Sequence, residues 1–178
     1  FVEPILTPPM LYIFGGGHVS MALAHAAHTA GFAIGVIDDR DTFANQQRFP
    51  MATEMYTSYD EAFEKIRPNA SSYLVIVTRG HRDDMRVLGW AVKTDARYIG
   101  MIGSKRKVLS VYKALEVQGA SAERFEHVHA PVGLEIGALT PEEIAISITA
   151  ELIAIRRNAA NLPHKSVTLS KTTPATTA

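Results

Sequence analysis

The sequence contains no cysteine, and this absence excludes disulfides, thiolate metal sites and a cysteine nucleophile within the chain. We expect a reducing, cytoplasmic location from the same observation. An excess of charge of either sign is also missing, because 18 Lys and Arg residues balance 18 Asp and Glu residues. No global basic field favours nucleic acid, so we expect no nucleic-acid partner and infer that charge acts locally.

Long apolar runs are missing as well. Gly, His or charged residues interrupt each apolar stretch well before the roughly 20 residues that a membrane span needs. The N-terminus lacks the basic region and apolar core of a signal peptide. We therefore expect no membrane partner. The chain begins with Phe rather than Met, which we interpret as a processed product or a fragment of something longer.

The most informative stretch that is present covers residues 11–40. A short apolar run at 11–14 meets Gly15, Gly16 and Gly17, a segment with helical spacing of apolar residues follows, and a second apolar run ends in Asp38. This order of strand, glycine turn, helix, strand and acid predicts a Rossmann-like βαβ unit. The alternative is that the glycines only make a tight turn and that nothing is bound there.

Each part of this stretch has a physical role in binding a nucleotide. Glycines let the backbone approach a phosphate, which the start of the following helix can hold. Asp38 lies 21 residues beyond Gly17 and can accept the hydroxyls of a ribose. Ser20 stands where the usual fingerprint has its third glycine, and we expect it to hold the helix slightly further from the sheet.

The remaining chain repeats the alternation of strand and helix. We predict strands at 54–57, 73–77 and 98–102, helices at 60–66 and 83–93, and a helix that ends near Gln118. Thr140 and Pro141 begin a further helix that ends at Arg157 or Asn158, with Ile144, Ile148, Leu152 and Ile155 on one stripe. This alternation predicts an α/β fold, a doubly wound, mostly parallel sheet with helices on both faces.

The predicted organisation is a lead-in at 1–10, a single domain at 11–165 and a disordered tail at 166–178, where Thr, Ser, Lys and Ala dominate. In such sheets ligands bind at the carboxyl ends of the strands. Four segments lie there by position, at 15–18, 38–40, 78–81 and 103–106. We therefore expect them to converge on one pocket.

Charge within this predicted pocket distinguishes its ligands. A 2′-phosphate near the carboxylate of Asp38 would be repelled by about 4 kcal/mol, so a free ribose is favoured. Arg40 offsets part of this cost if it turns inward, and its alternative is a solvated surface position. The cations near Gly103 and Ser104 work against the helix dipole, which favours an anionic partner over an ordinary capped helix with a charged face.

Histidines carry the remaining candidate chemistry. His18 and His81 could carry protons or donate hydrogen bonds to a ligand, or serve only in capping and packing. His25 and His28 have helical spacing for a metal but no third ligand nearby in sequence. His127 and His129 would face the same way on a strand, but no carboxylate completes a site. We predict no metal site and no catalytic residue.

Several segments resemble one known family. FGGGHVS, VIDDR, TRGHRDD, YIGMIGSKRK and above all HAPVGLEIGALTPEEIAISITAELIA are similar to the C-terminal Rossmann domain of the xanthine dehydrogenase accessory factor (XdhC/CoxI) family. The resemblance covers residues 11–157. The family's usual N-terminal domain has no counterpart here, so we expect a fragment or a separately encoded partner.

This resemblance implies a cytoplasmic chaperone, often a homodimer, that binds the molybdenum cofactor (molybdopterin) and assists its sulfuration and insertion into a molybdenum hydroxylase. By matching motifs, the implied cofactor-binding residues are Gly15, Gly16, Gly17, His18, Asp38, Arg40, His81, Gly103, Ser104, Lys105 and Arg106. NAD or another adenine nucleotide would make similar physical demands. The alternatives are therefore an NAD-dependent oxidoreductase and a nucleotide-sensing Rossmann domain.

Overall fold

A six-stranded parallel sheet forms the centre of the molecule, as shown by a computed structural model that describes residues 7–159. The strand order is β3-β2-β1-β4-β5-β6. The strand order reverses between β1 and β4, so the chain adopts the doubly wound α/β fold predicted from its alternating pattern. The strands are β1 (Met10–Phe14), β2 (Ala33–Ile37), β3 (Ala52–Tyr56), β4 (Ser72–Ile76), β5 (Tyr98–Met101) and β6 (Val128–His129).

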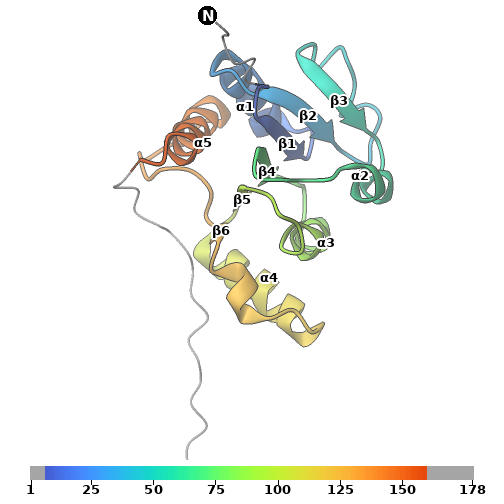
Figure 1. Ribbon diagram of the computed structural model, residues 1–178, viewed down its shortest axis with the longest axis vertical. Helices are drawn as coiled ribbons and strands as arrows, with labels where there is room; N and C mark the ends of the chain where they lie inside the picture. The colour runs from blue at the N-terminus through green and yellow to red at the C-terminus, as the bar shows by residue number, and fades with distance from the viewer. Residues whose placement is uncertain (1–6, 160–178) are drawn as a thin grey trace, which may run out of the picture.

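Helices cover both faces of this sheet (Figure 1). Helices α1 (His18–Thr29) and α5 (Pro141–Arg156) pack side by side on one face. The opposite face carries α2 (Tyr59–Lys65), α3 (His81–Ala91), α4 (Lys105–Val117) and the 3-10 turn η1 (Ala122–Phe125).

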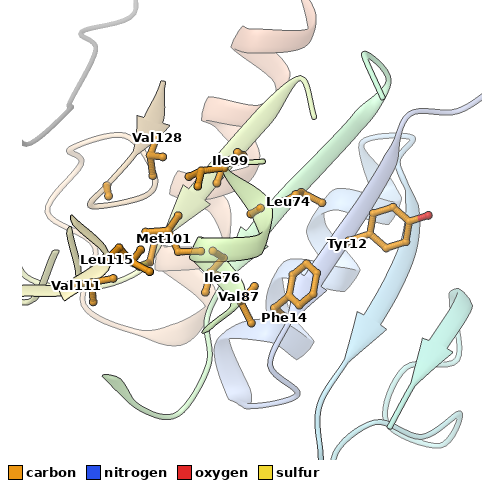
Figure 2. Close-up of a cluster of buried hydrophobic side chains, with 14 of the residues drawn as sticks. Tyr12, Phe14, Leu74, Ile76, Val87, Ile99, Met101, Val111, Leu115 and Val128 are labelled. Carbon is orange, nitrogen blue, oxygen red and sulfur yellow. The ribbon is translucent and has the colours of Figure 1, made fainter. Parts of the chain in front are cut away.

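Alternation along the strands divides the interior into two cores. In β1, Leu11 and Ile13 pack under α1 and α5, whereas Tyr12 and Phe14 pack under the other helices. Figure 2 shows part of the second core, where Phe14, Ile76 and Met101 from three strands lie near Val87 of α3. Strands buried on both faces read as continuous apolar runs, which is why β1 and β4 were recognisable in the sequence.

Helix starts follow their capping chemistry. The Oγ1 of Thr140 accepts from Glu143 N at 3.2 Å, and the carboxylate of Glu143 accepts from Thr140 N, so the predicted start of α5 is confirmed. Ser58 caps α2, since its Oγ accepts from Glu61 N at 3.4 Å. The prediction that the next helix begins at Asp83 was wrong, because α3 starts at His81 with Gly80 as its cap.

Two stretches of the predicted organisation lie partly or wholly outside the described residues. Met10 already belongs to β1, whereas residues 1–6 of the expected lead-in are not described. The expected tail at 166–178 is likewise outside them. Within residues 7–159, no helix combines the length and apolar character that crossing a bilayer requires.

Candidate functional site

A pocket of about 590 Å³ opens at the carboxyl ends of the strands, beside the point where strand order reverses. Its volume falls in the usual range for small-molecule sites. Residues from the ends of β1, β2, β4 and β5 line it, together with the start of α5: Gly15, Gly16, Gly17, His18, Val19, Ser20, Asp38, Arg40, Phe43, Val77, Thr78, Arg79, Ile102 and Pro141.

The three positions of the loop after β1 differ in why they hold glycine. Gly15 has a φ of 116°, and a Cβ there would lie 2.4 Å from the carbonyl oxygen of Val77. A Cβ on Gly16 would lie 2.7 Å from the carbonyl oxygen of Phe43. Gly17 has an ordinary φ of −74°, and a Cβ there would meet nothing within 4 Å. Packing thus explains Gly15 and Gly16, whereas Gly17 leaves open space at the pocket.

The start of α1 offers unpaired donors to this space. Gly17 is the N-cap, and no side chain caps this helix within the described part of the chain. The first N–H bonded back along the helix is that of Met21, to Gly17 O at 3.0 Å, so the amides of His18, Val19 and Ser20 have no helical acceptor. Helices α2, α4 and α5, by contrast, are capped by Ser58, Ser104 and Thr140.

Ser20 adds a hydroxyl to the same end of the helix. Ser20 is only 1% exposed, and its Oγ has no hydrogen-bond partner among the described residues. Buried hydroxyls are nearly always hydrogen-bonded, so this one needs an explanation. From the sequence, Ser20 was expected only to hold the helix further from the sheet. A hydroxyl at the position of the third glycine was the signal that could have identified Ser20 as a site residue.

Both carboxylate oxygens of Asp38, the predicted acceptor of ribose hydroxyls, have hydrogen-bond partners within the chain. Its Oδ2 accepts from Gly16 N and from Arg40 Nη2, both at 2.8 Å. Its Oδ1 accepts from the backbone N of Arg40 at 3.0 Å and from Nε at 2.8 Å. Burial by itself would raise the pKa of Asp38, but the hydrogen bonds from Arg40 and Gly16 outweigh it and lower that pKa.

Arg40 turns inward, which excludes its alternative as a solvated surface residue. The bidentate pair with Asp38 fixes its guanidinium, which lies 3.6 Å from the ring centroid of Phe43. Arg48 approaches the other side of the loop, where Nη2 donates to Gly16 O at 3.0 Å. Contacts from the loop after β2 therefore hold the glycine loop in place. The sequence did not predict this role for Phe43 or Arg48.

The loop after β4 is joined to α4 by a buried network. Thr78 Oγ1 donates to Asp84 Oδ1 at 2.6 Å, and Lys107 Nζ lies 2.5 Å from Asp84 Oδ2. Asp84 is fully buried, so Lys107 serves as its counter-ion and is not a free cation of the segment after β5. Thr78 carries this network to the wall of the pocket.

The remaining predicted site residues lie at the same edge of the sheet but do not line this pocket. His81 is exposed at the start of α3, and Lys105 and Arg106 are exposed in the first turn of α4. Ser104 caps α4, since its Oγ accepts from Lys107 N at 3.3 Å. Gly103, with a φ of 150°, makes the turn before it.

The two pairs of histidines differ in their surroundings. His25 and His28 are both exposed on α1. His127 lies outside β6 and is exposed, whereas His129 is buried with Nδ1 2.6 Å from Glu151 Oε1. A carboxylate from α5 therefore does meet His129, contrary to the sequence analysis. No cluster of three or more His, Asp or Glu residues suited to a metal occurs within residues 7–159.

The glycine loop, the uncapped start of α1 and the acid at the end of β2 are arranged as in Rossmann domains. Comparison with known families agrees, because residues 11–152 match the XdhC Rossmann domain family. The chain belongs to the XdhC Rossmann domain family. The family resemblance noted from the sequence motifs is thereby confirmed.

Several relatives of this XdhC domain are known. The chain is 34% identical over 153 residues to the uncharacterized protein YqeB of Escherichia coli (strain K12), covering 85% of this chain and 28% of that protein. It is 30% identical over 164 residues to a protein of Bacillus subtilis (strain 168) named as a probable xanthine dehydrogenase subunit, covering 90% of this chain and 47% of that protein.

A solved structure has the same fold. A crystal structure of a xanthine dehydrogenase from Bacillus halodurans superposes with a TM-score of 0.75 at 31% identity, covering 88% of this chain and 45% of that one. The XdhC domain thus spans less than half the length of these relatives.

Proposed function

We propose that the glycine-loop pocket binds a phosphate-bearing cofactor. The observation that carries this proposal is the Oγ of Ser20, which lies buried at the pocket without a partner among the described residues. An unsatisfied buried hydroxyl costs about 1–3 kcal/mol, which a ligand oxygen would recover by accepting from it. Gly17 leaves room for that ligand, and the first amides of α1 supply further donors.

The cofactor we propose is the molybdenum cofactor, held for sulfuration and insertion into a xanthine dehydrogenase-like molybdenum hydroxylase. Family membership and the names of two relatives support this assignment. A pterin cofactor carries a phosphate or a pyrophosphate-linked nucleotide, and donors at Val19, Ser20 and Arg40 suit either. The cofactor supplies the redox chemistry of the target enzyme, whereas this chain binds and orients it as a chaperone.

The direct test is anaerobic calorimetric titration of the purified chain with molybdenum cofactor, NAD, NADP and ADP. We expect the molybdenum cofactor to bind in the micromolar range. Ser20→Ala should weaken that binding about tenfold, because it removes one hydrogen bond to an anionic oxygen. Its thermal stability without ligand should be unchanged or higher, since an unsatisfied buried hydroxyl is lost.

Ser110→Ala, an exposed serine on α4, is the matched control and should change neither quantity. Unchanged cofactor affinity in Ser20→Ala would remove the hydroxyl from the site. Hydride transfer with any substrate would instead favour the NAD-dependent oxidoreductase, and tight NAD binding alone would favour a nucleotide sensor. Homodimerisation, a cytoplasmic location and contacts from His81 and residues 103–106 stay predictions.

A further inference from the structure

The subsite at the end of β2 has an acid and an arginine that are already paired. Both oxygens of Asp38 are used by the four donors from Gly16 and Arg40, and Asp38 is 2% exposed. A free ribose that donates its two hydroxyls to this carboxylate would have to displace the guanidinium. The subsite therefore cannot bind a free ribose in the usual way without breaking this partly buried ion pair.

The same arrangement leaves one edge of Arg40 available. Its Nε and Nη2 donate to Asp38, whereas no acceptor within residues 7–159 is in hydrogen-bond range of Nη1. The side chain is 26% exposed and lines the pocket. Its pairing with Asp38 and its stacking on Phe43 hold the guanidinium in one orientation, which lowers the entropy cost of binding an anion.

The charges around the pocket favour an anion as well. Among the described residues that line it, Arg40 and Arg79 are cations and Asp38 is the single carboxylate, so the lining carries one net positive charge. Asp39 lies nearby, with Oδ1 3.9 Å from Arg40 Nε, but its side chain is 49% exposed and solvent screens it. A phosphate placed at Arg40 therefore meets directed donors rather than an open carboxylate.

We infer that the Arg40 subsite selects a phosphate monoester over a free ribose. This inference rests on the proposed function, because it takes the glycine loop to hold the other anionic group of the same ligand. The monoester could be the ribose 2′-phosphate of a nucleotide or the terminal phosphate of a pterin cofactor without a nucleotide. It reverses the expectation from Asp38 alone, which favoured a free ribose.

The test compares 5′-ADP with 2′,5′-ADP by calorimetry at one ionic strength, and adds nucleotide-free molybdenum cofactor as a third arm. For a nucleotide source, 2′,5′-ADP should bind at least tenfold more tightly than 5′-ADP. Arg40→Gln should lower 2′,5′-ADP binding to the level of 5′-ADP and so abolish that difference, because the 2′-phosphate loses its donor. A merely structural role of Arg40 would weaken both ligands together.

Two further variants make the result specific. Arg40→Lys keeps the charge but not the planar fork, and it should retain the fold while losing most of the preference. Arg82→Gln, an exposed cation on α3 that does not line this pocket, is the matched control and should not change the ratio between the two nucleotides. For a pterin source, only the nucleotide-free cofactor should bind, and Arg40→Lys should weaken it.

The contrary outcomes are distinct. If 5′-ADP binds as tightly as 2′,5′-ADP, or if the preference survives Arg40→Lys and Arg40→Gln, the inference is wrong while the glycine loop stands as a phosphate site. If none of the three ligands binds, the inference and the proposed function both fail.

Discussion

At the scale of single residues, Gly15 and Gly17 separate the needs of the fold from those of a ligand. Gly15→Ala should destabilise the protein by about 1–3 kcal/mol or more, because it forces an L residue to a φ of 116° and against the backbone of Val77. Gly17→Ala should change stability by less than about 1 kcal/mol. Urea denaturation of both variants measures this difference. Equal destabilisation would show that Gly17 serves the fold.

A second prediction at this scale concerns how Asp38 contributes to stability as the pH falls. Its folded pKa is lowered, so the pairing stabilises the protein above the unfolded value of 3.8 and is lost as the pH falls through the folded pKa. Asp38→Asn should cost about 1–3 kcal/mol at pH 7. That deficit should stay constant down to about pH 4 and shrink below it. Urea midpoints from pH 3 to 7 test the sign, and a deficit that grows in acid would contradict the assignment.

At the scale of elements, α5 both packs on the sheet and anchors the loop after β6. Glu151 is buried, and its carboxylate meets His129 Nδ1 and accepts from the backbone N of Gly133. Glu151→Ala should lower the free energy of unfolding by about 1–3 kcal/mol, because two buried groups lose this acceptor. Chemical denaturation measures the effect. Glu142→Ala, an exposed position on the same helix, should cost less than about 1 kcal/mol, and a similar loss in both would contradict the anchoring role.

At the scale of the whole molecule, one sheet joins two cores, so the protein should unfold as a unit. Trp90, the single tryptophan, lies on α3 and packs, partly buried, against the core on that face, so its fluorescence reports on that side alone. Ile148→Ala in the opposite core should destabilise by about 2–5 kcal/mol and shift the Trp90 fluorescence transition together with the circular-dichroism transition. Ile146→Ala, exposed on the same helix, should shift neither. Separate transitions by the two probes would show that the cores unfold independently.

The sequence by itself determined the alternation of elements and most of their ends. Continuous apolar runs at β1 and β4 need no tertiary information, because a strand buried on both faces must be apolar at each position. Ser58 and Thr140 mark helix starts through local hydrogen bonds that span three residues. The start of α3 was predicted two residues too late because its cap, Gly80, is a weak cap signal.

Only the tertiary structure decided how the site's charges are used. Asp38 and Arg40 are two residues apart, yet nothing in that spacing says whether the arginine turns toward the acid or toward solvent. Lys107 belongs to the cationic segment after β5, but its partner Asp84 comes from α3. His129 meets Glu151, which lies 22 residues further along the chain, on α5. Local periodicity and capping are encoded by neighbours in the chain, whereas the partner of a buried charge is set by which elements the fold brings together.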